Sequence, residues 1–231
     1  MKIMRINLAI LFSVILIFSI SSCEQLNTET PLTDAEITQG LKEALRVGTD
    51  SSTYNAHKLD GYFKNVKIKI PFPQEAKNAE TILRNAGFSS LVDDFVLKLN
   101  RAAEDAADDA KGIFINAITT MTIVDALGIL EGSNNAATSY LRSKTYDSLS
   151  KIFNPQIQAS LSSVGASQAW TTLTSTYNKI PLVTPINTDL ADYATNKALD
   201  GLFILVADEE LKIRTDPVAR VTEILQKVFG K

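Results

Sequence analysis

The chain has 231 residues, 45% of them hydrophobic, and its 23 basic and 26 acidic residues give a net charge of −3 at pH 7. A chain of this size and composition can bury a sizeable core as one domain. The acidic balance argues against nucleic acid as a partner, because phosphate backbones are bound by clustered Lys and Arg.

Residues 1–22 have the pattern of a lipoprotein signal peptide. Lys2 and Arg5 supply positive charge, and the apolar run at 8–20 is too short to span a bilayer. The run ends in Ile-Ser-Ser before Cys23, which resembles a bacterial lipobox, and Cys23 is the only cysteine in the chain. We therefore predict cleavage before Cys23 and lipidation of its thiol, and no disulfide within the chain. Loss of Lys2 and Arg5 lowers the net charge from −3 to −5.

This N-terminus predicts attachment to a membrane through the lipid, in the cell envelope of a Gram-negative bacterium, with the outer membrane favoured over the inner. Residues 23–31 are polar and lack periodicity, so we expect a flexible tether there. Residues 32–231 are expected to form a single mainly α domain built around two long helices.

The first predicted helix begins at a capping box, in which the Thr33 hydroxyl and the Glu36 carboxylate have the required spacing. We expect this helix to fray through 50–52 and to be over by His57. Residues 66–70 then alternate between apolar and lysine side chains. The other extended candidate is 180–186, so we predict at most a short two-stranded pair between these two segments.

The stretch 89–131 contains the main organising element. Its apolar residues recur every three or four positions, and alanines fill its middle, which allows neighbouring helices to approach closely. We predict a central helix of about eight turns, packed on more than one side. The recurring residues are Leu91, Phe95, Leu99, Ala102, Ala106, Ala110, Phe114, Ala117 and Met121.

The remaining helices follow from their start and stop signals. Gly87, Gly132, Gly165 and Gly230 mark helix ends, and Pro155 is expected to interrupt a helix. The predicted helices lie at 73–86, 123–130, 133–154, 157–164, 166–178, 190–214 and 217–229.

Few residues suggest catalysis. His57 is the only histidine, and no G-x-S-x-G turn accompanies it, so a solvated or capping role is favoured. Glu104 and Asp108 lie one turn apart on the central helix, but a carboxylate-bridged metal pair normally adds Glu-x-x-His from two helices, which this chain lacks. We predict no metal site, cofactor or catalytic residue, and treat these acids as a solvated helix face.

Polar residues on the two long helices suggest a structural role instead. Asn100, Arg101 and Glu104 interrupt the apolar pattern of the central helix, and Lys197 and Asp200 lie on the second long helix. We call these five residues the polar seam. They are expected to join the helices through an ion-pair network that includes Arg101 and Asp200; the alternative is a set of independent surface charges.

Several stretches resemble a family catalogued as domain of unknown function 4197, which occurs in Gram-negative bacteria, often behind signal peptides. The similarity runs from about Pro31 to the C-terminus, and it implies one undivided domain without an assigned activity or catalytic residue. The stretches are TDAEITQGLKEALRVGTDSS, LVDDFVLKLNRAAEDAADDAKGIFINAITTMTIVDALGILEG, ATSYLRSKT and ATNKALDGLFILVADEELKIRTDPVARVTEILQKVFG.

Three functional hypotheses remain. The preferred one is a lipid-anchored binding or scaffold module, and not an enzyme, whose partner is an unidentified envelope protein or an apolar ligand. The second is a carrier that holds an apolar or lipid ligand between the long helices, which needs an internal cavity of about 300 Å³ or more. The third is a carboxylate-dependent hydrolase that uses Glu104 or Asp108, with Glu209 or Glu210 as the second acid, and it needs two converging acids in a cleft.

Overall fold

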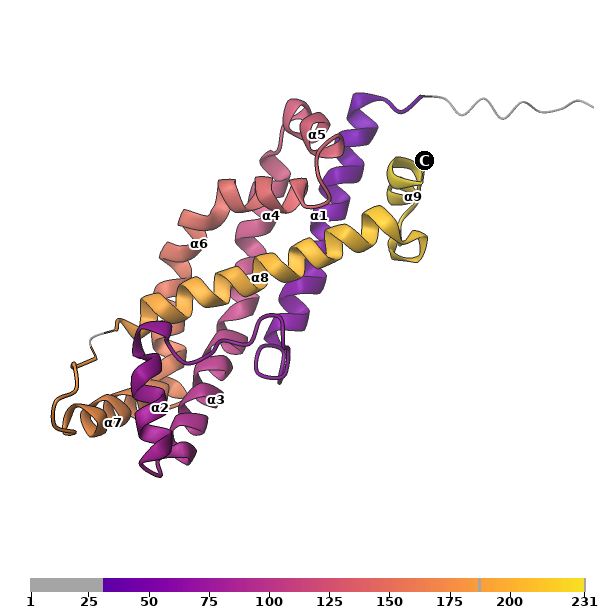
Figure 1. Cartoon of the computed structure of the whole chain (residues 1–231). Coiled ribbons are helices and arrows are strands. Elements are labelled where there is room, and N and C mark those ends of the chain that lie inside the picture. The colour runs from indigo at the N-terminus through magenta and orange to yellow at the C-terminus, as the bar shows by residue number, and fades with distance from the viewer. Residues whose placement is uncertain (1–30, 187, 231) are drawn as a thin grey trace, which may run out of the picture. The chain divides into compact units, whose positions relative to one another are not determined.

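The regular structure is helical throughout the part of the chain that the computed structural model describes, residues 31–186 and 188–230, where no strand occurs. The mainly α fold class and its single compact helical domain are therefore confirmed. The predicted signal peptide and Cys23 lie outside the described residues. The helices are α1 (Asp34–His57), α2 (Lys77–Asn85), α3 (Ser89–Ala106), α4 (Ala110–Thr120), α5 (Ile123–Leu130), α6 (Ala136–Ser163), α7 (Ala166–Asn178), α8 (Leu190–Thr215) and α9 (Glu223–Phe229) (Figure 1).

The predicted central helix is present as a rod formed by α3, a 3₁₀ turn at Ala107–Asp109 and α4. Together they cover 89–120, about nine turns. Most of the predicted apolar stripe is buried, and Ala106 and Ala110 are at most 1% exposed. The rod packs against α1 and α6, and its alanines admit those helices at close range (Figure 1).

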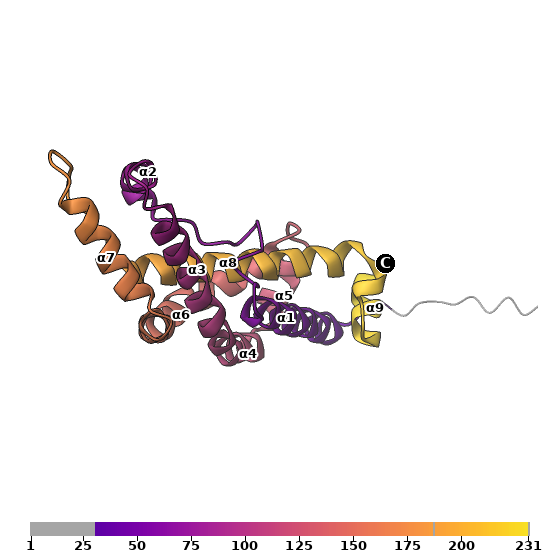
Figure 2. The same cartoon turned by 90° about the horizontal axis from the view of Figure 1, so that it is seen from below.

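The second predicted long helix is α8, which lies across α6, α3 and α1 (Figure 2). Gly201 permits this packing, because a Cβ there would lie 2.7 Å from Cε1 of Tyr62. The Tyr62 ring is fully buried, and its hydroxyl donates a hydrogen bond to the Ala198 carbonyl at 2.6 Å. The segment that follows α1 is thereby fixed to α8.

The extended pair does not form: residues 66–70 and 180–186 contain turns and irregular backbone. Ile68 and Ile70 are buried among the helices, while Val66 is 95% exposed. A side chain replaces the missing strand partner, because Asn100 Oδ1 accepts from the Ile70 N–H and Asn100 Nδ2 donates to the Ile70 carbonyl, both at 2.8 Å. One buried amide therefore satisfies the backbone groups that a neighbouring strand would have paired.

Pro155 does not interrupt α6, which is continuous from Ala136 to Ser163. An internal proline costs a helix about 3 kcal/mol. Phe153 and Ile157 on either side of it are fully buried, so packing against the neighbouring helices outweighs that local cost.

α1 continues without a break through the expected frayed region and ends at His57, close to its predicted end. The region where fraying was expected stays helical, because buried hydroxyls there donate hydrogen bonds to carbonyls of the same helix. Ser52 donates to Gly48 at 2.6 Å and Thr53 to Thr49 at 2.9 Å. Its start agrees with the prediction, with both hydrogen bonds of the Thr33 capping box present.

The predicted last helix is split in two. A 3₁₀ turn at Pro217–Ala219 comes first, and α9 begins after Thr222, whose hydroxyl accepts from the Leu225 N–H. α9 packs on α1 at Gly40, where a Cβ would lie 2.5 Å from Cγ2 of Val228.

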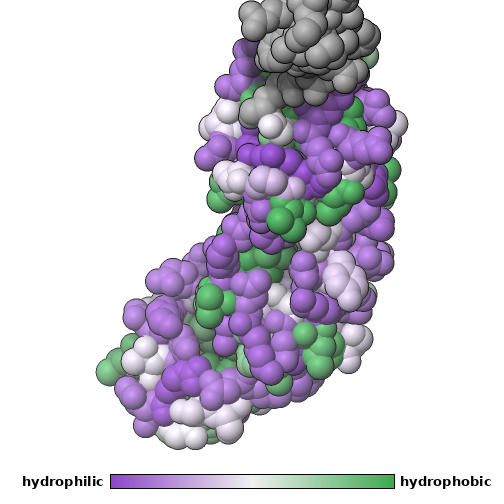
Figure 3. Space-filling view, turned by 90° about the vertical axis from the view of Figure 1, so that its right-hand side faces the viewer, coloured by the Kyte–Doolittle hydropathy of each residue, from purple (hydrophilic) through white to green (hydrophobic). Residues whose placement is uncertain are grey.

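The surface drawn in Figure 3 is mainly hydrophilic, with apolar residues in small separate groups. In the described ranges, no single helix is both long and apolar enough to cross a membrane. The bent combination of 89–120 with α5, at 101°, meets the length and composition criteria only as a pair.

Candidate functional site

Glu104 is a buried carboxylate with a structural set of partners. It is 4% exposed, and its Oε1 accepts hydrogen bonds from the backbone N–H groups of Tyr62 and Phe63 at 3.1 and 3.0 Å. Its Oε2 accepts from Nη1 of Arg101 at 2.6 Å. Both oxygens are thus engaged, and Glu104 fixes the turn that follows α1 to the central rod.

Arg101 extends this contact to Asp60, whose Oδ1 lies 2.7 Å from Nη2 of the arginine. Hydrogen bonds from Lys64 and Arg101 hold the pKa of the Asp60 carboxyl below its ordinary value. Asp60 has a φ of +67°, in the left-handed region, and Gly61 follows it, which is a local turn signal. The sequence pattern did not single out Asp60, although this dipeptide marks its position.

The predicted ion-pair network that includes both Arg101 and Asp200 does not form among the described residues, because each has a different partner. Asp200 Oδ1 accepts from Nη2 of Arg142, on α6, at 2.6 Å. Lys197 is exposed on α8. The polar seam therefore separates into a buried part that holds residues 60–70 on the rod and an exposed part on α8.

Glu104 and Asp108 do not converge either. Asp108 lies in the 3₁₀ turn of the rod and is exposed, whereas Glu104 lies on α3 and accepts hydrogen bonds at the buried turn around Tyr62. No group of three or more His, Cys, Asp or Glu among the described residues is arranged to hold a metal ion.

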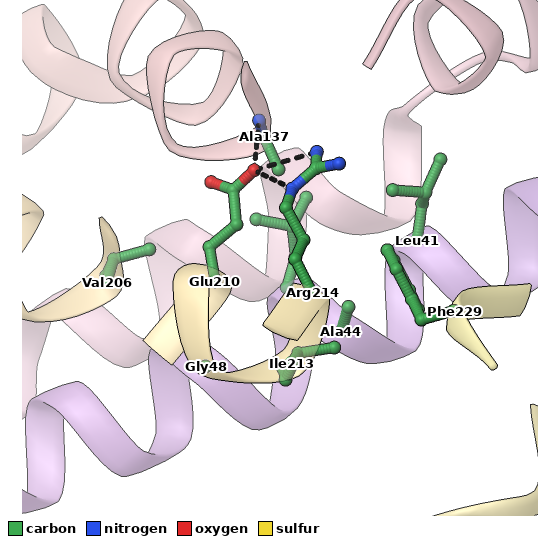
Figure 4. Close-up of a pocket in the computed structure, with 10 residues that line it drawn as sticks. Leu41, Ala44, Gly48, Ala137, Val206, Glu210, Ile213, Arg214 and Phe229 are labelled. Atoms are coloured by element: carbon green, nitrogen blue, oxygen red, sulfur yellow. Dashed lines mark hydrogen bonds and ion pairs between the residues drawn. The ribbon is translucent and has the colours of Figure 1, made fainter. Parts of the chain in front are cut away.

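A second buried carboxylate, Glu210 on α8, caps the N-terminal end of α6. Its Oε1 accepts from the Ala137 N–H at 3.0 Å, and its Oε2 accepts from the N–H and hydroxyl of Thr138 at 2.8 and 2.7 Å. Figure 4 shows the Glu210 carboxylate directed at Ala137 with Arg214 beside it. Glu210 therefore supplies the acceptors that the first amides of a helix need.

Arg214 joins a third helix to this arrangement. Its Nη2 lies 2.9 Å from Glu210 Oε1 and also donates to the Ile129 carbonyl at 3.0 Å, in the last turn of α5. A guanidinium at a helix C-terminus is favourably placed with respect to the helix dipole. The Glu210–Arg214 pair thus links the end of α5 and the start of α6 to α8.

The apolar pocket beside this pair is nearly filled. Leu41, Val206 and Phe229 are among its lining residues (Figure 4), and its free volume is about 10 Å³. That is about the room of one water molecule, whereas small-molecule sites measure about 300 to 1,000 Å³.

A larger hollow of about 350 Å³ lies between residues 67–71, α6 and α8. We call it the cationic hollow. Four basic side chains and one acid line it: Lys67, Lys69, Arg142, Lys197 and Asp200.

Three of its four basic groups have contacts that orient them. Nζ of Lys67 lies 2.6 Å from Asp208 Oδ2, and Nζ of Lys69 lies 4.4 Å from the centre of the Phe63 ring. Arg142 pairs with Asp200 and lies over the ring of Tyr146 at 4.7 Å. Within residues 31–186 and 188–230, Lys197 has no carboxylate within ion-pair distance.

A family model described as "Protein of unknown function (DUF4197)" matches residues 31–230, which is most of the chain. The chain belongs to the DUF4197 family. The resemblance inferred from the sequence is therefore confirmed. No curated protein and no solved structure matches the chain. Membership in DUF4197 assigns no activity to the chain.

Two kinds of charged site thus coexist in this DUF4197 chain. The buried acids, Glu104 and Glu210, are occupied by backbone amides and arginines. The cationic hollow is open, and four basic side chains line it. Sequence reasoning found Lys197 and Asp200 but missed Arg142, which lies nearly sixty residues away in the chain and carries no local signal.

Proposed function

We propose that this protein is a lipid-anchored binding module of the bacterial cell envelope, that it performs no catalysis, and that the cationic hollow is its ligand site. The proposal depends on one difference between the buried acids and the cationic hollow. Both oxygens of Glu104 and of Glu210 accept structural hydrogen bonds. The hollow, in contrast, is open and lined by four basic side chains, one of which, Lys197, has no ion-pair partner among the described residues.

This contrast favours binding over hydrolysis. A glycosidase-type mechanism needs one carboxyl to donate a proton and another to attack or to activate water. Glu104 could do so only by releasing the Tyr62 and Phe63 amides, which would leave buried donors unpaired at a cost of about 1 to 3 kcal/mol each.

The carrier hypothesis finds less support than the binding module. A carrier needs an enclosed apolar space, and the apolar pocket between α1, α8 and α9 has only about 10 Å³ free. The larger hollow has charged walls, which suit a polar ligand at the surface.

The lipid anchor rests on the sequence around Cys23, and a labelling experiment tests it. Cells expressing the protein are fed an alkyne-tagged fatty acid, and we expect label on the wild type and none on a Cys23→Ala variant. The wild type should fractionate with membranes and resist extraction by high salt. An unlabelled wild type that is found in the soluble fraction would rule out the anchor.

Ligand binding is tested on protein purified from its native envelope in mild detergent. Native mass spectrometry should show a bound species on the wild type that is lost from a Lys69→Gln/Lys197→Gln variant. A Lys151→Gln/Lys179→Gln variant, in which two exposed lysines outside the hollow are changed, is the control with equal charge. Equal retention by both variants would count against the hollow as the ligand site.

A further inference from the structure

We propose that the cationic hollow binds a phosphate group, carried either by an anionic lipid headgroup or by a soluble phosphate compound. This inference rests on the proposed function, because it names the ligand of the same site. Its basis is the charge, the geometry of Arg142 and the size of the hollow.

The charge of the hollow is opposite to that of the chain. Four of its lining residues are basic and one is acidic, in a protein whose net charge is −3. Counting Asp208, which pairs with Lys67, the local balance is still positive. Basic groups gathered in a recess raise the local concentration of a small anion, even where the whole chain is acidic.

Arg142 is pre-oriented for a planar contact with an anion. Asp200 takes one of its N–H groups, and the guanidinium is held over the rings of Tyr146 and Phe203 at 4.7 and 5.1 Å. A guanidinium has five N–H donors, so donors remain for the paired oxygens of a phosphate. An immobilised arginine loses less conformational freedom on binding than a free one.

The lysines supply charge from two other directions. Lys69 comes from the segment that Asn100 anchors, and Lys197 comes from α8. A phosphate carries more than one negative charge in its monoester form and presents several acceptor oxygens, so it can bind more than one cation at once. A single carboxylate would leave most of these donors unused.

The size and floor of the hollow limit the ligand. At about 350 Å³ it is at the small end of ligand sites, and it is a single recess without an extended basic stripe. Its apolar lining includes the buried Ile68 and Ile70 and the partly exposed Ile204, at 42%. A phosphate with a short organic substituent fits this arrangement better than a nucleic acid strand does.

The test is calorimetric titration of the full chain in a non-ionic detergent. The phosphate probes are inorganic phosphate, glycerol 3-phosphate, and the short-chain lipids dihexanoyl phosphatidylglycerol and dihexanoyl phosphatidylcholine. A short glutamate-rich peptide is titrated beside them. Tighter binding of the anionic lipid than of the zwitterionic lipid and the soluble phosphates assigns the site to headgroups. Tighter binding of the soluble phosphates assigns it to a soluble compound. Both results support the proposal.

Variants connect the binding to the hollow. Removing one charge-assisted contact is expected to weaken binding about tenfold, so Lys69→Gln/Lys197→Gln should lose about a hundredfold. The affinity of the Lys151→Gln/Lys179→Gln control should stay within about twofold of the wild type, because both substituted lysines are exposed and lie outside the hollow. This control has the same net charge as the hollow variant. Arg142→Lys keeps the charge but not the planar fork, and should weaken phosphate binding about tenfold.

Three results would overturn the proposal: no binding of any phosphate probe to the folded wild type, equal weakening in the hollow and control variants, or binding of an acidic peptide in preference to every phosphate. Circular dichroism of each variant establishes that it is folded. The labelling of Cys23 is measured independently, so a failure here is distinguishable from a failure of the lipid anchor.

Discussion

Replacement of Asn100 by alanine is expected to be among the most destabilising polar substitutions in the domain. The Asn100 amide is fully buried and is the hydrogen-bond partner of both backbone groups of Ile70, which is 1% exposed. The substitution leaves a buried N–H and a buried C=O without partners, each at a cost of about 1 to 3 kcal/mol. We therefore expect a loss of about 2 to 6 kcal/mol in the free energy of unfolding, out of a total of about 5 to 15 kcal/mol.

The assay is urea unfolding of the purified protein, followed by far-ultraviolet circular dichroism and by tryptophan fluorescence. Asn100→Leu preserves most of the side-chain volume, so a similar loss in that variant would assign the effect to hydrogen bonds and not to a cavity. Asn116→Ala changes an exposed asparagine on α4 of the same rod and should cost less than about 0.5 kcal/mol.

Hydrogen exchange gives a local measurement of the same contact. The Ile70 amide should be protected in the wild type and should exchange much faster in Asn100→Ala, because its acceptor is lost. A variant that loses less than about 1 kcal/mol and keeps a slow Ile70 amide would refute the claim that Asn100 replaces a strand partner.

Three further predictions concern other contacts. Glu210→Ala should lower the free energy of unfolding by about 3 kcal/mol or more, because it removes the acceptor at the start of α6 and leaves the largely buried Arg214 without its carboxylate. The neighbouring Glu209→Ala should lower it by less than about 1 kcal/mol. Equal losses in unfolding titrations of the two variants would contradict the capping role. The pKa of Glu36 is lowered from 4.5 to about 2, chiefly by the hydrogen bond from Lys227, so its contribution to stability is complete above pH 4.5 and is lost as the pH falls toward 2. Glu36→Gln should therefore show a shallower decline in melting temperature over that window, and an unchanged decline would show that this carboxyl is not responsible. Gly201→Ala should cost about 1 to 3 kcal/mol, because its Cβ would lie 2.7 Å from a buried tyrosine ring carbon, and a neutral effect in thermal unfolding would mean that the ring can move aside.

Features set by neighbours in the chain were predictable from the sequence. The capping box at Thr33 and the left-handed Gly87 after α2 each depend on residues within a few positions of one another. The long apolar stripe of the central helix was equally visible, because its period extends over many turns.

Features set by distant residues were not predictable. The alternation of 66–70 correctly separates buried isoleucines from exposed lysines, but the partner of this segment is an asparagine side chain on α3 and not a strand. Pro155 lies inside a helix because the surrounding packing is strong enough to keep it there. The period of two fails at Val66, which is 95% exposed, and it does not report what covers the two buried isoleucines.

The candidate site also combines residues that local sequence patterns identify with residues that they do not. Lys197 and Asp200 were selected as polar residues on a long helix, yet their setting depends on Arg142 and on the lysines of 67–69, which come from other parts of the chain. Spacing in the sequence gave no means of bringing these segments together.

The contact between Glu210 and the start of α6 also bears on how the protein is made. The amides that open α6 find their acceptor 72 and 73 residues later in the chain. A ribosome must therefore pass residue 210 before the start of this helix can be capped. Fragments that stop short of residue 210 should be open to proteases at their centre, so the domain is expected to persist in cells only after α8 has been made.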